Sequence, residues 1–257
     1  MSDTGLPASL EMAWGLRERP SKGPKPGLTL DAIVTTAVQL ASTEGLAAVS
    51  MVRVAKALGV STMSLYRYVG ARDELYILMQ EAVTPPPPEP DPTAGWRASL
   101  TRWAHAQRAA FHRNLWLLRI PISGPPATPR SVEWMESGLS ALSGTGLDEP
   151  TKLGVIMLVS GHVRSEAMLM SDLDAAYTAR GLAPDDVLRR YTRTLAHLTD
   201  PERHPAVTRL LDSGELTGTE DPDADFEFGL GLILDGIEAL ISRGPSAGRT
   251  KPDKRAP

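Results

Sequence analysis

Residues Thr62 to Arg72 carry side chains that suit contacts with nucleic acid. The stretch reads TMSLYRYVGAR and contains hydroxyls, phenols and two guanidinium groups, which can bond to base edges and phosphates. A helix that reads DNA lies in the major groove, about 12 Å wide, and needs a second helix joined to it by a tight turn. With Leu65 facing a core, the outer side of this helix would present Thr62, Met63, Ser64, Tyr66, Arg67 and Tyr68.

The elements that would position these side chains are short helices with clear start and stop signals. Thr, Ser and Gly at the expected caps predict four helices, over about 29–45, 50–58, 61–69 and 72–83. Gly59 permits the tight turn between the second and the third. Arg72 begins the fourth helix, where its charge and the free N–H groups could hold a phosphate.

The charge of the chain is unevenly distributed. Between Arg17 and Arg72 there are eight Lys or Arg against three acids, a local net charge of +5 within a chain of net charge −4. The remaining residues therefore carry −9, and a basic end on an acidic body is expected when only one domain meets phosphate. The alternative is a helical hairpin inside an ordinary bundle, with Tyr66 and Tyr68 as packing residues.

Beyond these helices the sequence predicts a second, larger helical domain. The stretch TPPPPEPDP, residues 84–92, cannot be helical and is interpreted as a linker. Helical patterns follow at about 93–112, 129–144, 149–171, 184–199 and 223–243, and no stretch alternates as a strand. The predicted fold class is all-α, with a flexible basic arm (1–28, with a short possible helix near Leu10–Trp14), a three-helix helix-turn-helix domain (29–83), a linker (84–92), a ligand-binding and dimerisation domain (93–243) and a disordered tail (244–257).

Composition limits where the protein works and what it can bind. Cysteine is absent, which rules out disulfides and thiolate metal sites and fits a reducing compartment. The first twenty residues lack the order of a secretory signal, and no apolar run approaches the roughly 20 residues that a membrane span needs. We therefore expect a cytoplasmic protein without a membrane partner.

The run from Leu28 to Met79 resembles the DNA-binding domain of the tetracycline-repressor (TetR) family of transcriptional regulators. The match includes ALGVSTMSLYRYV and the following RDEL, and a weaker likeness at Asp225–Ile241 extends it over about 29–243. The resemblance implies a homodimer on a palindromic double-stranded DNA operator, usually a repressor that a small-molecule effector releases. By motif position it assigns DNA contacts to Lys25, Thr29, Ser50, Thr62, Ser64, Tyr66, Arg67, Tyr68 and Arg72.

Two apolar helices are candidates for the dimer interface. The last helix carries a stripe with alternating four- and three-residue steps, and Gly229 and Gly236 would permit close approach. The helix from Glu149 is apolar on nearly all sides, too much for one core face. The expected interface residues are Leu153, Ile156, Phe226, Leu230, Ile233, Ile237 and Leu240; the alternative is that both helices are internal core.

Aromatic and polar side chains on the middle helices are candidates for the effector site. They are Trp103, Phe111, His112, Trp116, Trp134, Met135 and His162, although Trp or Met at helical spacing is more often plain core. Family members that bind a magnesium–tetracycline chelate use a histidine and an acid. The corresponding positions here fall near Ile122 and Met170, so we expect neither tetracycline nor any metal or cofactor.

An enzyme is the competing class of function. GPSAG at 244–248 matches the nucleophile elbow of hydrolases, but it lacks the preceding strand that this motif needs. The five histidines show no metal-ligand spacing with acids. The sequence therefore favours a regulator, and leaves open whether it represses, activates or acts without an effector.

Overall fold

The computed structural model describes residues 8–16, 28–122, 124–181, 183–214 and 223–244, and over these ranges the chain is helical without strands. The N-terminal part contains α1 (Ala8–Ala13), α2 (Leu30–Glu44), η1 (Leu46–Ala48), α3 (Met51–Ala57), α4 (Thr62–Tyr66) and α5 (Arg72–Val83). The C-terminal part contains α6 (Trp96–Arg113), η2 (Leu115–Arg119), α7 (Pro129–Ala141), α8 (Glu149–Arg180), α9 (Pro184–Leu198), α10 (Pro205–Ser213) and α11 (Ala224–Ser242). The predicted all-α class is confirmed.

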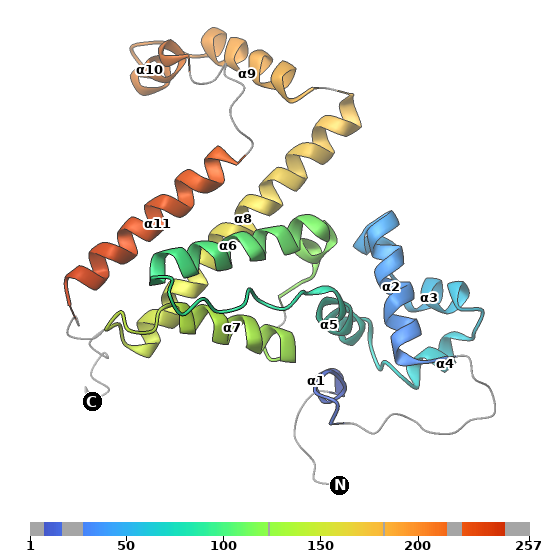
Figure 1. Cartoon of the computed structure of the whole chain (residues 1–257). Helices are drawn as coiled ribbons and strands as arrows, with labels where there is room; N and C mark the ends of the chain where they lie inside the picture. Colours follow the sequence, from blue (N-terminus) through green and yellow to red (C-terminus); the bar gives the residue numbers. More distant parts are fainter. Residues whose placement is uncertain (1–7, 17–27, 123, 182, 215–222, 245–257) are drawn as a thin grey trace, which may run out of the picture.

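The N-terminal helices enclose a small core of their own. Ile33 and Ala37 of α2, Leu65 of α4, and Leu75 and Met79 of α5 are all fully buried in it. Helices as short as α3 and α4 are marginal in isolation, so this burial is what stabilises them. The group forms one end of the molecule, to the right in Figure 1.

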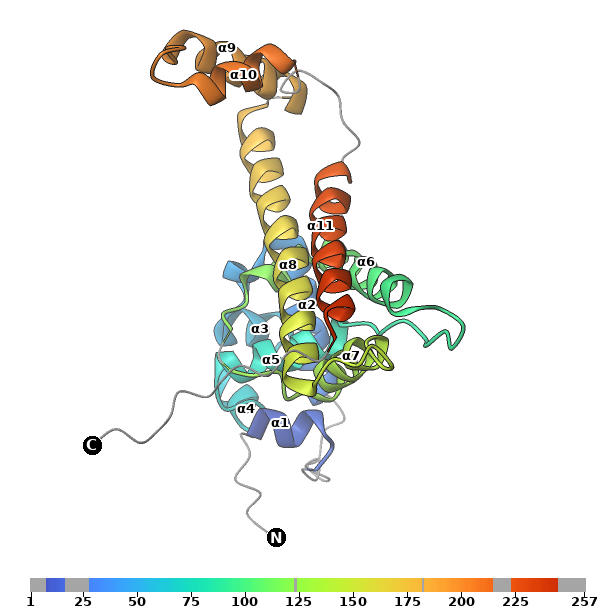
Figure 2. The same ribbon diagram turned by 90° about the vertical axis from the view of Figure 1, so that its left-hand side faces the viewer.

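The C-terminal helices pack around a second core, to which α6, α7, α8 and α11 contribute. Leu100 and Trp103 of α6, Val159 of α8, and Phe226 and Leu230 of α11 are buried there. Helices α8 and α11 run side by side, and the upper half of α8 extends beyond the body to α9 and α10 (Figures 1 and 2).

The two cores meet through η2. Trp116 and Leu117 of η2 are each 6% exposed and belong to the N-terminal core, although the sequence assigned them to the other domain. Phe111, at the end of α6, packs against both cores. The C-terminal domain is therefore anchored directly in the core that holds the helix-turn-helix.

Three expected boundaries need correction. The third helix ends at Tyr66, with Arg67 as its C-cap, rather than near Val69. The helix from Glu149 continues to Arg180, because no breaker occurs before Gly181, which ends it with φ +62°. Part of the expected flexible arm is folded: α1 packs on α5, and the Trp14 Nε1 donates to the Ala127 carbonyl at 2.8 Å.

Helix α8 is unusually long and apolar, although it also makes polar contacts. Among the described residues it is the one helix long and apolar enough to cross a membrane, which corrects the expectation that no segment has this property. Yet in its middle Arg164 and Glu166 bond to Leu118 and Arg108. A helix that turns one face to its own core and another to a protein partner has the same composition.

Candidate nucleic-acid interface and effector domain

Helices α3 and α4 form a two-helix unit with a tight turn. The side chains of Ser50 and Ser61 cap them, accepting from the N–H of Arg53 and Ser64 at 3.2 Å each. Between the helices Gly59 adopts φ +67°, a left-handed conformation that side chains other than glycine disfavour. The three local predictions for this unit, two serine caps and a glycine turn, are confirmed.

The outer side of α4 presents the side chains expected to read DNA. Tyr66 is 45% exposed and Met63 72% exposed, while Leu65 on the opposite side is fully buried. Arg67 is exposed beside them, and Thr62 and Ser64 are half-exposed. The Ser64 hydroxyl lies 2.9 Å from that of Ser61 and so is partly engaged within the turn. Four types of contact group, namely hydroxyl, phenol, thioether and guanidinium, thus share one surface.

Other expected DNA contacts have structural partners. The Tyr68 hydroxyl donates to the Leu28 carbonyl at 3.0 Å and its ring packs on the N-terminal core, so Tyr68 positions the chain before α2. Thr29 caps α2 by accepting from Ala32 N–H at 3.0 Å, the same role that Ser50 plays for α3. Lys25 lies outside the described residues.

Only some of the basic side chains around this surface form ion pairs with nearby acids. Arg53 donates two hydrogen bonds to Glu44, at 2.7 and 2.8 Å, so its charge is neutralised within the domain. Within the described residues no ion pair engages Lys56, Arg67 or Arg72, although Arg72 lies over the Tyr76 ring at 5.4 Å. Lys56 on α3 is a further candidate for a phosphate contact, which the sequence alone did not single out. Its exposure, which identifies it, is visible only in the structure.

The aromatic residues expected to form one effector pocket are divided among several places. Trp103 and Trp134 form a buried pair with ring centres 5.9 Å apart, and Met135 packs on the same core. His112 and Trp116 instead line a cleft of about 370 Å³ at the junction of the two domains. These candidate effector residues are therefore divided between the C-terminal core and the cleft at the domain junction.

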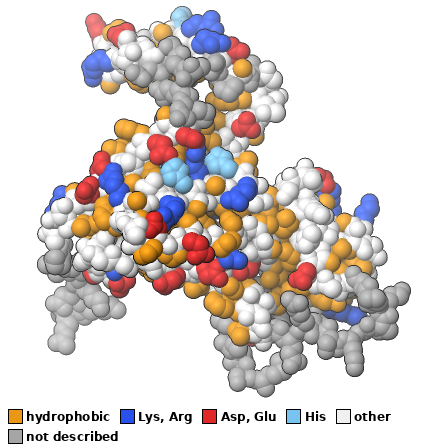
Figure 3. Space-filling model, viewed as in Figure 1, with side chains coloured by type: hydrophobic (Ala, Val, Ile, Leu, Met, Phe, Trp, Pro, Cys, Tyr) orange, Lys and Arg blue, Asp and Glu red, His pale blue; other side chains and the backbone are white. Residues whose placement is uncertain are grey.

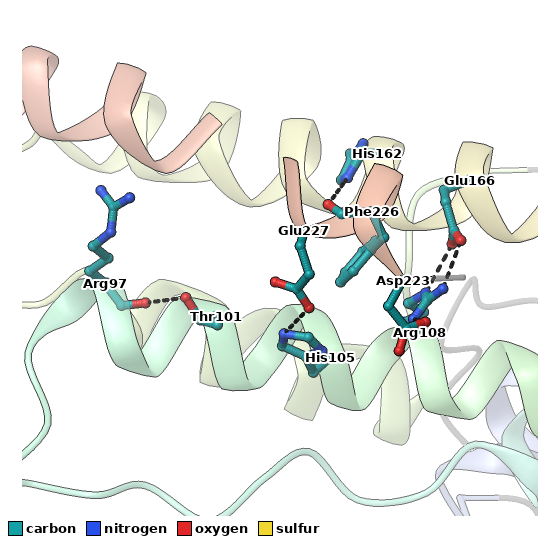
Figure 4. Close-up of polar contacts among 9 residues, drawn as sticks. All are labelled: Arg97, Thr101, His105, Arg108, His162, Glu166, Asp223, Phe226 and Glu227. Atoms are coloured by element: carbon teal, nitrogen blue, oxygen red, sulfur yellow. Dashed lines mark hydrogen bonds and ion pairs between the residues drawn. The ribbon is translucent and has the colours of Figure 1, made fainter. Parts of the chain in front are cut away.

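A largely buried ion pair of Arg108 and Glu166, extended by the exposed Asp223, joins α6, α8 and the start of α11, as Figure 4 shows. The Arg108 guanidinium donates to Glu166 at 2.9 and 3.1 Å and to Asp223 at 2.6 Å, and lies 4.5 Å from the Phe226 ring centre. Hydrogen bonding to Glu166 raises the pKa of Arg108 above its usual range, despite burial, and Arg108 lowers that of Asp223. These three residues lie far apart in the sequence, so no spacing signal could have revealed them.

The predicted ligand residue His162 belongs to the same region. Its Nε2 lies 3.1 Å from the Phe226 carbonyl and its ring stacks on Phe226 at 5.3 Å. A Cβ at Gly229 would meet the His162 ring at 2.4 Å, so Gly229 does permit the close approach of α11 to α8. Nothing lies within 4 Å of a Cβ at Gly236. His162 thus packs in the contact between α8 and α11.

Replacing Arg108 by methionine is expected to lower the free energy of unfolding by about 3–5 kcal/mol, because it leaves the buried Glu166 carboxylate without its cation. Denaturant unfolding followed by circular dichroism measures the change. The matched control is Arg97→Met, since Arg97 also joins α6 to α11, through Asp235 and Glu238, but is 41% exposed. The control should cost less than about 1 kcal/mol. Equal losses in the two variants would contradict a structural role for the buried Arg108–Glu166 pair.

Four of the residues expected at the dimer interface are core residues instead. Ile156, Phe226, Leu230 and Ile237 are at most 4% exposed and pack within the chain. Ile233 and Leu240 are half-buried, and Leu153 is 41% exposed. The stripe read from the sequence is the inward face of α11, since an amphipathic pattern does not tell which partner a face meets.

The opposite faces of α8 and α11 carry large apolar side chains that the described residues of the chain leave exposed. Met157 and Leu158 of α8 are 67% and 56% exposed, and Phe228 and Leu232 of α11 are 70% and 58% exposed. We call these four residues the outer face. Figure 2 looks onto α8 and α11 from the side on which no other helix covers them.

Comparison with known proteins assigns the chain. A family model described as "Bacterial regulatory proteins, tetR family" matches residues 33–79, and one described as "Tetracyclin repressor-like, C-terminal domain" matches residues 89–241. The second covers more than half of the chain. The chain belongs to the TetR family of transcriptional regulators.

Full-length relatives agree with this assignment. The HTH-type transcriptional repressor DrrR1 of Streptomyces coeruleorubidus is 38% identical over 244 residues, which is 93% of this chain and 88% of that protein. A solved structure of ActR from Streptomyces coelicolor, in complex with actinorhodin, superposes with a TM-score of 0.71 at 31% identity, covering 84% of this chain and 98% of ActR. ActR has also been solved with (S)-DNPA.

Family membership fixes the general activity. The α2–α4 domain of this TetR-family regulator is a DNA-binding helix-turn-helix domain, and the protein is a transcriptional regulator, not an enzyme. The nucleophile-elbow match begins at Gly244, directly after α11, and its other residues lie outside the described ranges.

Proposed function

We propose that the protein is a homodimeric repressor that binds a palindromic operator and that a small apolar or aromatic ligand releases. The carrying observation is the outer side of α4, where Tyr66 and Arg67 are exposed above a buried Leu65. DrrR1 is named a repressor, and ActR binds actinorhodin and (S)-DNPA, which supports the same pair of activities here. We expect this activity in the cytoplasm, where the DNA lies.

Two copies are needed because a helix as short as α4 reads only one half-site. Twofold symmetry places two such helices about 34–36 Å apart, one turn of DNA. The outer face of Met157, Leu158, Phe228 and Leu232 supports this assembly, because exposed apolar patches on soluble proteins usually mark partner contacts. Two helices from each copy would then pack as a four-helix interface.

The recognition assignment is tested by Arg67→Ala and Tyr66→Ala. Each is expected to weaken operator binding by about 1–3 kcal/mol, or roughly 5- to 150-fold, through loss of a base or phosphate contact. Fluorescence anisotropy against the DNA flanking the protein's own gene, at two salt concentrations, gives the affinity and its salt dependence.

Arg189→Ala is the matched control, since Arg189 is an exposed arginine of α9 paired with Asp186 at 2.5 Å. It should leave operator affinity unchanged. Unaltered binding in both α4 variants, with the dimer intact, would remove α4 as the recognition helix. Equal weak binding to every DNA sequence would instead contradict the operator-specific function.

A further inference from the structure

A cleft of about 710 Å³ lies between the proline-rich segment and the helices α6 and α7. Its walls are residues 86–92 on one side, with Trp96, Arg102 and Trp103 of α6 and Glu136 and Ser140 of α7 on the others. This volume lies in the range of small-molecule sites, about 300–1,000 Å³. Only Trp103 among the ligand residues expected from the sequence lines it.

Rings make up most of the apolar lining of the cleft. Two tryptophans and five prolines line it, and Trp103 is held by a hydrogen bond of its Nε1 to the Trp134 carbonyl at 3.0 Å. Trp103 is only 3% exposed, so the tryptophan face accessible to a ligand is that of the half-buried Trp96. An accessible tryptophan face favours contact with flat ring systems and attracts a cation. The surface therefore suits a planar aromatic molecule.

The polar part of the cleft is strongly acidic. Four carboxylates line it, from Glu89, Asp91, Glu133 and Glu136, against the single cation Arg102. Arg102 lies 3.7 Å from Asp91, and Glu133 pairs with Arg130, but within the described residues no cation pairs with Glu136, which accepts from the Ser140 hydroxyl at 3.0 Å. Acidic side chains gather along the lower edge of the C-terminal domain in Figure 3. This surplus of negative charge attracts cations and repels anions.

The walls of the cleft are bonded to the helix that leads into the DNA-binding domain. Glu81 of α5 accepts from the Arg130 N–H in the first turn of α7, at 3.1 and 3.2 Å. The Pro85 carbonyl accepts from the Trp134 Nε1 at 2.8 Å. Helix α5 in turn buries Leu75 and Met79 in the core that holds α4. A ligand that moves α7 or the proline-rich segment would therefore move α5, and the recognition helix that shares its core would move with it.

We propose that this cleft binds a planar aromatic molecule that carries a positive charge, and that its occupation lowers DNA affinity through α5. The second part rests on the proposed repressor function, whereas binding to the cleft does not depend on it. An effector bound in this cleft would be an aromatic cation rather than any apolar or aromatic compound.

The binding test uses two xanthene dyes of similar shape and opposite charge, rhodamine 6G and fluorescein, with the full chain and no DNA. Dye anisotropy should show saturable binding of rhodamine 6G and at least about 10-fold weaker binding of fluorescein. Glu133→Gln/Glu136→Gln should weaken rhodamine 6G binding about 10-fold, and Trp96→Ala by a similar factor. The control Glu202→Gln removes an exposed acid outside the cleft and should have no effect.

Equal affinity for the two dyes, or unchanged rhodamine 6G binding in both cleft variants, would overturn the site. Near-native thermal melting of the glutamine variant ensures that its loss of binding is not unfolding. The coupling is tested by adding rhodamine 6G to the operator complex of the wild type and of the glutamine variant. Any direct effect of the dye on DNA is the same for the wild type and the glutamine variant. Release of operator DNA from the wild type alone therefore supports coupling, and equal release from both proteins overturns the coupling. Failure to find an operator contradicts the repressor function but leaves the dye result standing.

Discussion

Replacement of Phe228 by glutamate is expected to give a folded monomer that has lost operator affinity. Phe228 is 70% exposed on the outer face of α11. A carboxylate at this position stays hydrated in a monomer, whereas dimerisation through the outer face would bury it without a partner, which is costly. Loss of the second half-site should weaken operator binding at least about 100-fold, because binding through two linked sites exceeds one by that factor or more. Sedimentation velocity and operator titration measure the two effects.

The control for this variant lies in α9, away from the outer face. Leu198→Glu introduces the same charge at another exposed apolar residue, 70% exposed at the end of α9, and should leave both dimer and affinity unchanged. Circular dichroism should show native helicity in the two variants. A Phe228→Glu protein that sediments as a dimer with native operator affinity would refute the outer face as the interface.

Replacement of Phe226 by alanine, two residues earlier on the same helix, is expected to have a different effect. Phe226 is fully buried, stacks on His162, and has His105 at its edge and Arg108 over its face. Removing the ring leaves a cavity and should lower the free energy of unfolding by about 3–5 kcal/mol. Chemical denaturation gives this value, and the thermal midpoint should fall with it.

Phe228→Ala is the matched control, since it removes the same ring from the outer face and should leave the unfolding of a dissociated chain nearly unchanged. Phe226→Leu, which retains most of the buried volume, should recover much of the lost stability. If Phe226→Ala dissociated the dimer without loss of chain stability, Phe226 would belong to the interface, as the sequence pattern alone predicted.

Local chemistry made the N-terminal domain predictable. The caps at Thr29, Ser50 and Ser61 and the turn at Gly59 depend on interactions within three or four residues, and all occur as expected. The exposed Tyr66 and Arg67 follow from the same helical geometry once Leu65 is placed in the core. The segments most strongly marked in the sequence are those whose structure is decided by near neighbours.

Contacts over long sequence separations could not be predicted in this way. Trp116 carries the same signal as Trp103, yet it packs in the other core, because η2 crosses the domain junction. The Arg108–Glu166–Asp223 cluster joins residues up to 115 positions apart. The acidic cleft likewise depends on the proline-rich segment lying against α6 and α7.

The sequence by itself determined the all-α class, the helix-turn-helix and the family of this regulator. Only the tertiary structure decided which faces of α8 and α11 are internal, and therefore that Phe226 is core while Phe228 is exposed. The physical reason is that helical periodicity shows which residues share a face, whereas the partner of that face depends on how the helices pack. Both faces of these helices are apolar, so hydrophobicity could not distinguish the chain's own core from a surface for a second copy.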